Sequence, residues 1–119
     1  MIFICYPKCS TCQKARKWLE ERGISFEVRH ITEQNPTREE LALWQQRSGL
    51  PLKKFFNTSG LRYKALKLKE KLPEMSDQEQ LALLASDGML VKRPLLILED
   101  RVLVGFREEA WKAALETEQ

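Results

Sequence analysis

The chain of 119 residues has one histidine, His30, and three cysteines, all within its first twelve residues. Three cysteines in so short a stretch cannot form the disulfide framework of a small secreted protein. No apolar run approaches the ~20 residues that a membrane span needs. Met1 leads into a short apolar segment, without the charged start and long apolar core of a secretory signal. We therefore expect a cytoplasmic protein that makes no contact with a membrane.

The sequence also lacks a strong excess of charge of either sign. Its 20 basic and 17 acidic residues give a net charge of +3, whereas proteins that bind nucleic acid usually gather basic residues into a patch or stripe. The lysines between residues 64 and 71 have the spacing of a solvated helical face. Direct nucleic-acid binding is therefore not expected. The length and the 43% hydrophobic content predict a single domain over residues 1–119.

The first thirty residues have a strand-helix-strand pattern. Residues 2–5 are apolar and β-prone, as in a strand that is covered on both faces. From Ser10 the pattern becomes helical, and Gly23 is a typical stop signal. The apolar face of this helix is formed by Cys12, Ala15, Trp18 and Leu19. Residues 24–30 then alternate like an edge strand, and a crossover of this kind joins parallel strands.

The middle of the chain is predicted to be helical. Two capping boxes, Thr37-x-x-Glu40 and Ser76-x-x-Glu79, place side chains where each satisfies the other residue's backbone N–H. They predict one helix that ends at Gly49 and a second that ends at Asp87-Gly88. Between these helices we expect a loop around residues 57–60 and one short helix.

Strands return at the end of the chain. Residues 95–98 and 101–104 are predicted to form a hairpin that turns at Glu99-Asp100. A last helix over residues 108–115 should turn inward the side chains of Ala110, Trp111, Ala114 and Leu115. The element order predicts an α/β, thioredoxin-like fold with a four-stranded mixed sheet. Its core would be residues 1–31 and 91–119, with an all-helical insertion over about 36–90 between the βαβ and ββα halves.

The Cys9-Ser10-Thr11-Cys12 motif lies at the junction between the first strand and the first helix. A helix N-terminus stabilises a thiolate, so Cys9 is expected to be the reactive thiol, with Lys8 adding positive charge. Ser10 and Thr11 are candidates to cap the helix. Cys12 lies one turn further on, on the core-facing side, where it can resolve a mixed disulfide. The pattern predicts a redox pair of Cys9 and Cys12.

Two other interpretations of these cysteines remain open. Free cysteine is often buried, so both could simply fill the core. The spacing Cys5-x-x-x-Cys9-x-x-Cys12 also matches cysteines that hold a four-iron cluster, but Cys5 falls inside a strand. A zinc site would need a fourth ligand, and His30 is the sole histidine. We expect no metal, with Cys5 in the core and His30 at the surface end of a strand.

Arg93-Pro94 comes just before the second buried strand. In a thioredoxin-like fold this X-Pro lies opposite the Cys-x-x-Cys motif, and a cis bond there would let backbone groups face the substrate. The Arg93 guanidinium is always charged, so it is expected to hold an oxyanion or to stabilise the Cys9 thiolate. The alternative is a surface arginine before a trans proline.

Taken together, these residues resemble the arsenate reductase family in its broad sense, which includes the Spx-type regulators of Gram-positive bacteria. The segments that carry the resemblance are Tyr6-Pro7-Lys8-Cys9-Ser10-Thr11-Cys12-Gln13-Lys14-Ala15, Phe56-Asn57-Thr58-Ser59-Gly60, Lys92-Arg93-Pro94-Leu95 and Val104-Gly105-Phe106. The resemblance implies a nucleophilic cysteine at Cys9. In glutaredoxin-coupled arsenate reductases that cysteine attacks arsenate, which three arginines hold. Arg93 matches one of them and the other two positions fall near Asn57 and Gly105, so binding of arsenate is expected to be weak.

The Spx branch of the family implies a different use of the same motif. Spx-like proteins use the Cys-x-x-Cys as a redox switch and bind the C-terminal domain of the RNA polymerase α subunit through the insertion. Gly49 matches a glycine of that contact region, and Ser59 stands near the place of a contact arginine. A glycine that ends a helix is also explained without a partner.

The leading hypothesis is an arsenate-reductase-like thiol–disulfide oxidoreductase, with Cys9 as nucleophile, Cys12 as resolving thiol and Arg93 as anion or thiolate stabiliser. Its substrate would be a small disulfide or oxyanion. No cofactor is expected, and glutathione, glutaredoxin or thioredoxin would reduce the Cys9–Cys12 disulfide. The alternatives are a redox-sensing transcription regulator that binds RNA polymerase α, and an adaptor module with an idle thioredoxin fold.

Overall fold

A four-stranded mixed sheet with the strand order β2-β1-β3-β4 lies at the centre of the fold. The computed structural model describes residues 1–118. Strand β1 (Ile2–Cys5) is parallel to β2 (Glu27–His30) and antiparallel to β3 (Leu95–Ile97). Strand β4 (Val102–Val104) pairs with β3 as a hairpin. The sheet and its βαβ and ββα halves confirm the predicted thioredoxin-like architecture.

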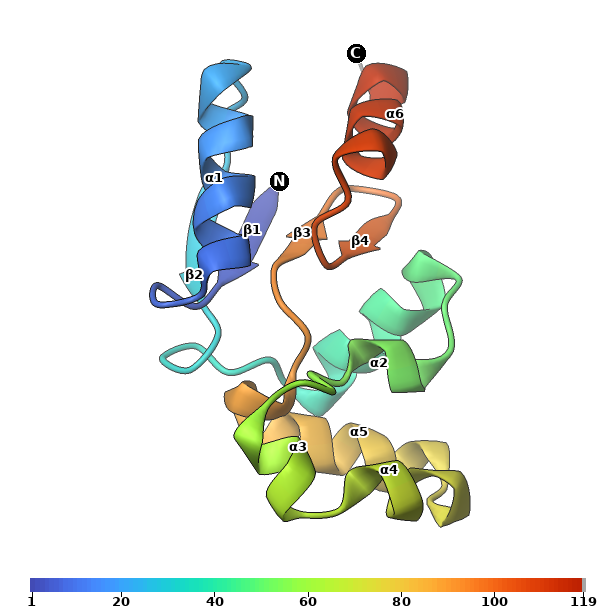
Figure 1. Cartoon of the computed structure of the whole chain (residues 1–119). Helices are drawn as coiled ribbons and strands as arrows, with labels where there is room; N and C mark the ends of the chain where they lie inside the picture. Colours follow the sequence, from blue (N-terminus) through green and yellow to red (C-terminus); the bar gives the residue numbers. More distant parts are fainter. Residues whose placement is uncertain (119) are drawn as a thin grey trace.

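The helices α1 (Ser10–Glu21) and α6 (Glu108–Glu118) pack on one face of the sheet (Figure 1). Trp111 of α6 lies in the core of this face, and its ring meets Phe106 edge-on with 4.9 Å between the centroids. Ala110 was expected to point inward, but it is exposed. The buried side chains of the helix are instead Trp111, Ala114 and Leu115.

The opposite face of the sheet packs against the segment that joins β2 to β3. Phe3 and Cys5 of β1 belong to the core under α1 and α6, whereas Ile4 belongs to the core under this joining segment. Successive side chains of a strand point to opposite faces, so one short strand contributes to both cores. This explains why residues 2–5 have no polar position.

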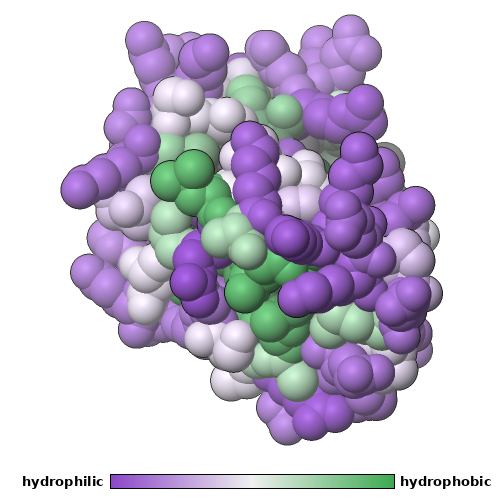
Figure 2. Space-filling view, turned by 60° about the horizontal axis from the view of Figure 1, so that its bottom comes forward, coloured by the Kyte–Doolittle hydropathy of each residue, from purple (hydrophilic) through white to green (hydrophobic). Residues whose placement is uncertain are grey.

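The joining segment is mostly helical. Its elements are α2 (Arg38–Ser48), η1 (Leu52–Phe55), α3 (Leu61–Ala65), α4 (Leu68–Lys71), η2 (Leu72–Glu74), α5 (Asp77–Ser86) and η3 (Gly88–Leu90). Both predicted capping boxes are formed, at the start of α2 and of α5. On the end of the molecule where α3, α4 and α5 lie, apolar surface forms a strip that is bordered by hydrophilic side chains (Figure 2). No helix within residues 1–118 is long and apolar enough to cross a membrane.

Residues 50–72 are more regular than the sequence predicted. The loop around residues 57–60 forms as expected, but η1 precedes it and two short helices, α3 and α4, follow it instead of one. An isolated antiparallel bridge between Phe56 and Val91 means that the insertion is not entirely helical. Helices this short are not stable alone. They form here because Leu52, Phe55 and Leu68 are buried against the rest of the insertion, which is a long-range effect.

Arg29 ties the edge strand β2 to α2. Its Nη1 and Nη2 donate to the two carboxylate oxygens of Glu40 at 2.6 and 2.7 Å. The same Glu40 accepts from the backbone N–H of Thr37 at 2.9 Å in the capping box. Both side chains of the ion pair are at least two-thirds buried, so the pair joins sheet and insertion in a partly dry environment.

The change Glu40→Gln should lower the free energy of unfolding by about 1–3 kcal/mol at neutral pH, because the charge-assisted bonds to Arg29 are lost. The side-chain hydrogen bond from Arg29 holds the pKa of Glu40 below its usual 4.5. The stabilisation is therefore complete above the unfolded-state pKa and disappears as the pH falls through the lower folded-state pKa. Urea unfolding of both proteins across this pH range measures the difference.

The matched control is Glu79→Gln. Glu79 makes the same capping box with Ser76, but within the described residues it forms no ion pair. An equal loss of stability in the two variants would mean that the capping box, and not the contact with Arg29, explains the effect.

Candidate functional site

Cys9 is the N-cap residue of α1, at the carboxyl end of β1. Its backbone is extended, with φ −83° and ψ 120°, and its own C=O accepts from the N–H of Gln13 at 3.1 Å. Ser10 and Thr11 were candidates to cap this helix, but they lie in its first turn, and no side chain forms a capping hydrogen bond at Cys9. The Cys9 sulfur therefore lies near helix N–H groups that a capping side chain would otherwise occupy.

The surroundings of Cys9 favour its thiolate. Partial burial raises the pKa of Cys9, and hydrogen bonds from the backbone and thiol of Cys12 and from the backbone N–H of Thr11 act in the opposite direction. The positive charge of Arg93 lowers it further, so that the pKa lies below the ordinary value of 9.0. Hydrogen bonds to the charged form and an opposite charge are the usual causes of an acidic thiol.

Cys12 has the opposite environment. It is 2% exposed, and its Sγ accepts from the backbone N–H of Tyr6 at 3.4 Å. Burial, together with the neighbouring Cys9, raises the pKa of Cys12 to about 12. The two sulfurs are thus unequal, with an accessible acidic thiol and a buried thiol that keeps its proton.

Cys5 and His30 have surroundings that differ from those of Cys9. Cys5 is buried in β1, and burial raises the pKa of its thiol. His30 is at the end of β2, where its Nδ1 lies 3.4 Å from the carboxylate of Glu33. Within residues 1–118 no group of three or more histidine, cysteine or acidic side chains is arranged to hold a metal ion.

The Arg93–Pro94 peptide bond is cis, and the Arg93 side chain is close enough to Cys9 for its charge to act on the thiol. The C=O of Pro94 accepts from the N–H of Gly105 at 2.8 Å. The Arg93 guanidinium lies over the ring of Tyr6, 5.1 Å from its centroid, and its Nη1 donates to the C=O of Met89 at 3.4 Å. Arg93 is therefore held between the Cys9 loop and η3, where its charge reaches the thiolate.

A pocket of about 970 Å³ opens beside Cys9. Asn57 and Gly105, the positions where the resemblance expected further arginines, both line it without charge. Its cationic lining residues are Lys53, Lys54, Arg62, Lys92, Arg93 and Arg107. None of the residues that line it in the described chain is acidic, so the pocket attracts anions.

The sequence pointed to Arg93 but not to the other cations of this pocket. They come from η1, α3 and the segments before β3 and after β4, and only the tertiary fold brings these segments together. Arg62 is also ion-paired with Asp87 at 3.0 Å. The sequence held a weak clue to two of these cations. Gly105-Phe106 and Ser59-Gly60 belong to motifs of the resemblance, and Arg107 and Arg62 lie just after them.

Gly49 ends α2 in the left-handed conformation, with φ +71°. A side chain there would meet nothing within 4 Å. The conformation therefore accounts for the glycine, and the position is exposed, as a partner contact would require.

The change Arg93→Gln should raise the pKa of Cys9 only in part, because it removes a nearby charge but keeps the hydrogen bonds from Cys12 and Thr11. The ultraviolet absorbance of the thiolate during a pH titration measures this shift. The control is Arg22→Gln, which makes the same change of net charge at the far end of α1, about 20 Å away along the helix. Equal shifts in the two variants would show that Arg93 has no specific effect on Cys9.

The sequence matches the ArsC family over residues 5–114. It is 57% identical over 112 residues to the uncharacterized protein YusI of Bacillus subtilis, covering 94% of this chain and 95% of that one. It is 33% identical over 103 residues to the global transcriptional regulator Spx of Enterococcus faecalis, covering 87% of this chain and 76% of Spx.

Solved structures give the same assignment. A protein of Bacteroides fragilis, described as related to the ArsC family, superposes with a TM-score of 0.92 at 59% identity and 94% coverage of both chains. A possible arsenate reductase from Streptococcus mutans has a TM-score of 0.85 at 45% identity, covering 93% of this chain and 96% of its own. With a family match over most of its length and relatives this similar, the chain belongs to the ArsC family.

Proposed function

We propose that the chain is a thiol–disulfide oxidoreductase in which Cys9 is the nucleophile and Cys12 is the resolving thiol. The observation that carries the proposal is the inequality of the two sulfurs. Cys9 lines a large pocket and has a lowered pKa, whereas Cys12 is buried with a pKa of about 12. A reactive pair needs such a division, because one thiol must attack first and the other must wait.

In the first step the Cys9 thiolate attacks one sulfur of a substrate disulfide. A bond forms between Cys9 Sγ and that sulfur, the substrate S–S bond breaks, and the other half leaves as a thiolate that takes up a proton. Cys12 then loses its proton to solvent and attacks Cys9 Sγ, so that the remaining half of the substrate leaves as a thiolate. The substrate gains two electrons, and the cysteine pair loses two as its disulfide forms. Glutathione, glutaredoxin or thioredoxin would return the pair to the dithiol.

The Cys9 thiolate itself regulates when Cys12 reacts. Besides burial, the hydrogen bond to Cys9 and the charge of Cys9 raise the pKa of Cys12. Once Cys9 is part of a mixed disulfide, its charge is gone and both of these contributions end. Cys12 therefore becomes easier to deprotonate only after the first step has taken place.

The pocket favours a disulfide with anionic groups over arsenate. Asn57 and Gly105 replace two of the arginines that hold arsenate in the family's reductases, and Arg62 is already paired with Asp87. The volume of about 970 Å³ is at the upper end of small-molecule sites and far exceeds an inorganic oxyanion. Arg93, beside Cys9, would hold the anionic group nearest to the reacting sulfur.

Turnover of hydroxyethyl disulfide with glutathione, coupled to glutathione reductase, tests the proposal. The wild-type protein should turn over, and Cys9→Ser should be inactive. Cys12→Ser should accumulate a mixed disulfide on Cys9, which mass spectrometry detects after digestion. Trapping on Cys12 in the Cys9→Ser protein, or unchanged turnover in that variant, contradicts the assigned roles. A parallel assay with arsenate should give little reduction.

A second candidate function is a redox-sensing transcription regulator, which the 33% identity to Spx supports. In that case the Cys9–Cys12 disulfide would be a switch, and the insertion around Gly49 would bind the C-terminal domain of the RNA polymerase α subunit. Titration of that purified domain into the reduced and the oxidised protein tests this candidate. Gly49→Asn, which tolerates the left-handed conformation, should weaken binding if Gly49 is in the contact. Tight binding without turnover by any reductant would replace the oxidoreductase proposal.

A further inference from the structure

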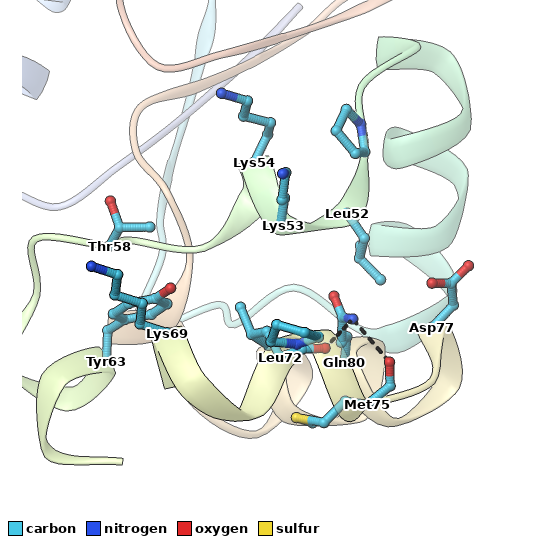
Figure 3. Close-up of a pocket in the computed structure, with 12 residues that line it drawn as sticks. Leu52, Lys53, Lys54, Thr58, Tyr63, Lys69, Leu72, Met75, Asp77 and Gln80 are labelled. Atoms are coloured by element: carbon cyan, nitrogen blue, oxygen red, sulfur yellow. Dashed lines mark hydrogen bonds between the residues drawn. The ribbon is translucent and has the colours of Figure 1, made fainter. Parts of the chain in front are cut away.

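A second pocket lies within the insertion, between η1 and the segment α4-η2-α5 (Figure 3). Its volume is about 580 Å³, which is within the range of small-molecule sites. Cys9 and Arg93 do not line it. Lys53, Lys54 and Thr58 line both pockets, so η1 and the loop after it form the wall that the two pockets share.

Gln80 of α5 forms part of the floor of this pocket and is 91% buried, since 9% of it is exposed. Its Nε2 donates to the C=O of Leu72 at 3.3 Å and to the C=O of Met75 at 3.2 Å. These two bonds use both hydrogens of the amide, so the group cannot be flipped without turning its oxygen toward two carbonyl oxygens. The orientation of the amide is therefore fixed.

The oxygen of this fixed amide has no hydrogen-bond partner among the described residues. In Figure 3 it points away from the two carbonyl groups and toward the space below Leu52 and Lys53. A buried acceptor without a donor is unfavourable by about 1–3 kcal/mol. The floor of the pocket thus presents an acceptor that a donor from outside the chain would satisfy.

The charges of the pocket are distributed unevenly. Lys69 stands beside Thr58 at one end, and Asp77 stands at the opposite end, with Gln80 nearer to Asp77 (Figure 3). Lys53 and Lys54 extend from η1 above the pocket (Figure 3). The walls between these ends are largely apolar and include Leu52 and Leu72. A matching ligand would have a negative group at the lysine end, an apolar body, and an N–H or O–H group at the Gln80 end.

We propose that this pocket binds a small organic anion with an apolar body and one N–H or O–H donor. The donor bonds to Gln80 Oε1 and the anionic group lies among the lysines. Because Oε1 is buried, a neighbouring side chain has to move for the donor to reach it. Met75, which lines the pocket and is half-buried, is unbranched and adapts easily.

Indole-3-acetate is a suitable probe because it has a carboxylate, an apolar ring and a single ring N–H. Titrated at millimolar concentrations into the full ¹⁵N-labelled chain, it should shift the Gln80 side-chain NH₂ and the amides of Lys53 and Met75 in a saturable way. The 1-methyl analogue lacks the donor and should bind about tenfold more weakly. Gln80 itself is left unchanged, because its amide also holds the carbonyl groups of Leu72 and Met75.

The variant Lys69→Gln tests the charged end of the pocket, because Lys69 lines this pocket and not that of Cys9. It should weaken binding of the probe about threefold. The matched control is Lys71→Gln, an exposed lysine of the same helix that does not line the pocket, and it should bind like wild type. Cys9→Ser should also bind like wild type, so this test is independent of the oxidoreductase proposal.

Three results would each overturn the proposal. They are the absence of saturable shifts, equal affinity for the two indole compounds, and equal weakening by Lys69→Gln and Lys71→Gln. Shifts centred on the residues around Cys9 and Arg93 would place the probe in the other pocket, which also overturns it.

Discussion

Cys9 should react with iodoacetamide at least tens of times faster than Cys12 in the folded, reduced protein at pH 7. Burial raises the pKa of Cys9, but the hydrogen bonds from Cys12 and Thr11 and the charge of Arg93 bring it below 9.0, so at least about 1% is thiolate at that pH. Burial and the neighbouring Cys9 raise the pKa of Cys12 to about 12, which leaves about one molecule in 100,000 as thiolate. The thiolate is the reactive form, so Cys9 should react faster. The ratio of rates is smaller than the ratio of thiolate fractions, because a thiolate of higher pKa is intrinsically more nucleophilic.

Timed labelling followed by digestion and mass spectrometry measures the rate at each cysteine. Cys5, which is buried and whose pKa is raised by burial, is an internal reference and should also be slow. In denaturant the three cysteines should react at similar rates, because the local environment is lost. Comparable rates at Cys9 and Cys12 in the folded protein would contradict the proposed order of attack.

The labelling rate of Cys9 and the stability of the fold should both depend on pH, in a direction set by the lowered pKa of Cys9. The pKa of Cys9 is lowered in the folded state, so labelling of Cys9 slows as the pH falls through that lowered value. By linkage, the Cys9 thiolate stabilises the fold most at a pH above the unfolded-state pKa. This stabilisation is lost as the pH falls through the folded-state pKa. A Cys9→Ser variant should not show this part of the pH dependence of stability.

The change Gly88→Ala should lower the free energy of unfolding by about 3 kcal/mol. A Cβ atom on Gly88 would lie 2.3 Å from the carbonyl oxygen of Ile31 and 2.6 Å from Oδ1 of Asn35. The first is a backbone atom directly after β2, and Asn35 is held by a hydrogen bond from its Nδ2 to the C=O of Ala85 at 2.9 Å. Neither neighbour can move without shifting the joint between sheet and insertion.

Chemical denaturation of the variant measures this loss, and Gly60→Ala is its control. A Cβ on Gly60 would meet chiefly Nδ2 of Asn57, at 2.6 Å, which is the end of a side chain that can rotate. The control should therefore lose less than about 1 kcal/mol. A similar loss in both variants would mean that a general property of glycine, and not the close contact at Gly88, is responsible.

The effect of Gly88→Ala should extend to the site. Met89, the next residue, accepts the hydrogen bond from Arg93, and the N–H of Lys92 bonds to the C=O of Phe55 at 2.7 Å. A shift of η3 would therefore move Arg93 relative to Cys9. The folded fraction of the variant should have a higher pKa at Cys9 than wild type.

The local elements were predictable because their causes are local. The two capping boxes need only residues three apart, and both form as expected. The apolar run of β1 and the apolar face of α1 follow from the periods of strand and helix. Of the short helices over residues 52–74 only one was predicted, because Leu52 and Leu68 stabilise them by packing against distant parts of the insertion.

The sequence by itself determined that a Cys-x-x-Cys lies where a strand meets a helix, and therefore which cysteine is near the helix N-terminus. It also favoured Arg93-Pro94 as the facing element, but it left open a surface arginine before a trans proline. Only the tertiary structure decided that Arg62, Lys92 and Arg107 share the pocket of Cys9, and that the Gln80 oxygen has no partner among the described residues. Periodicity and capping act over a few residues, whereas the charge of a pocket and the satisfaction of a buried polar atom depend on which distant segments pack together.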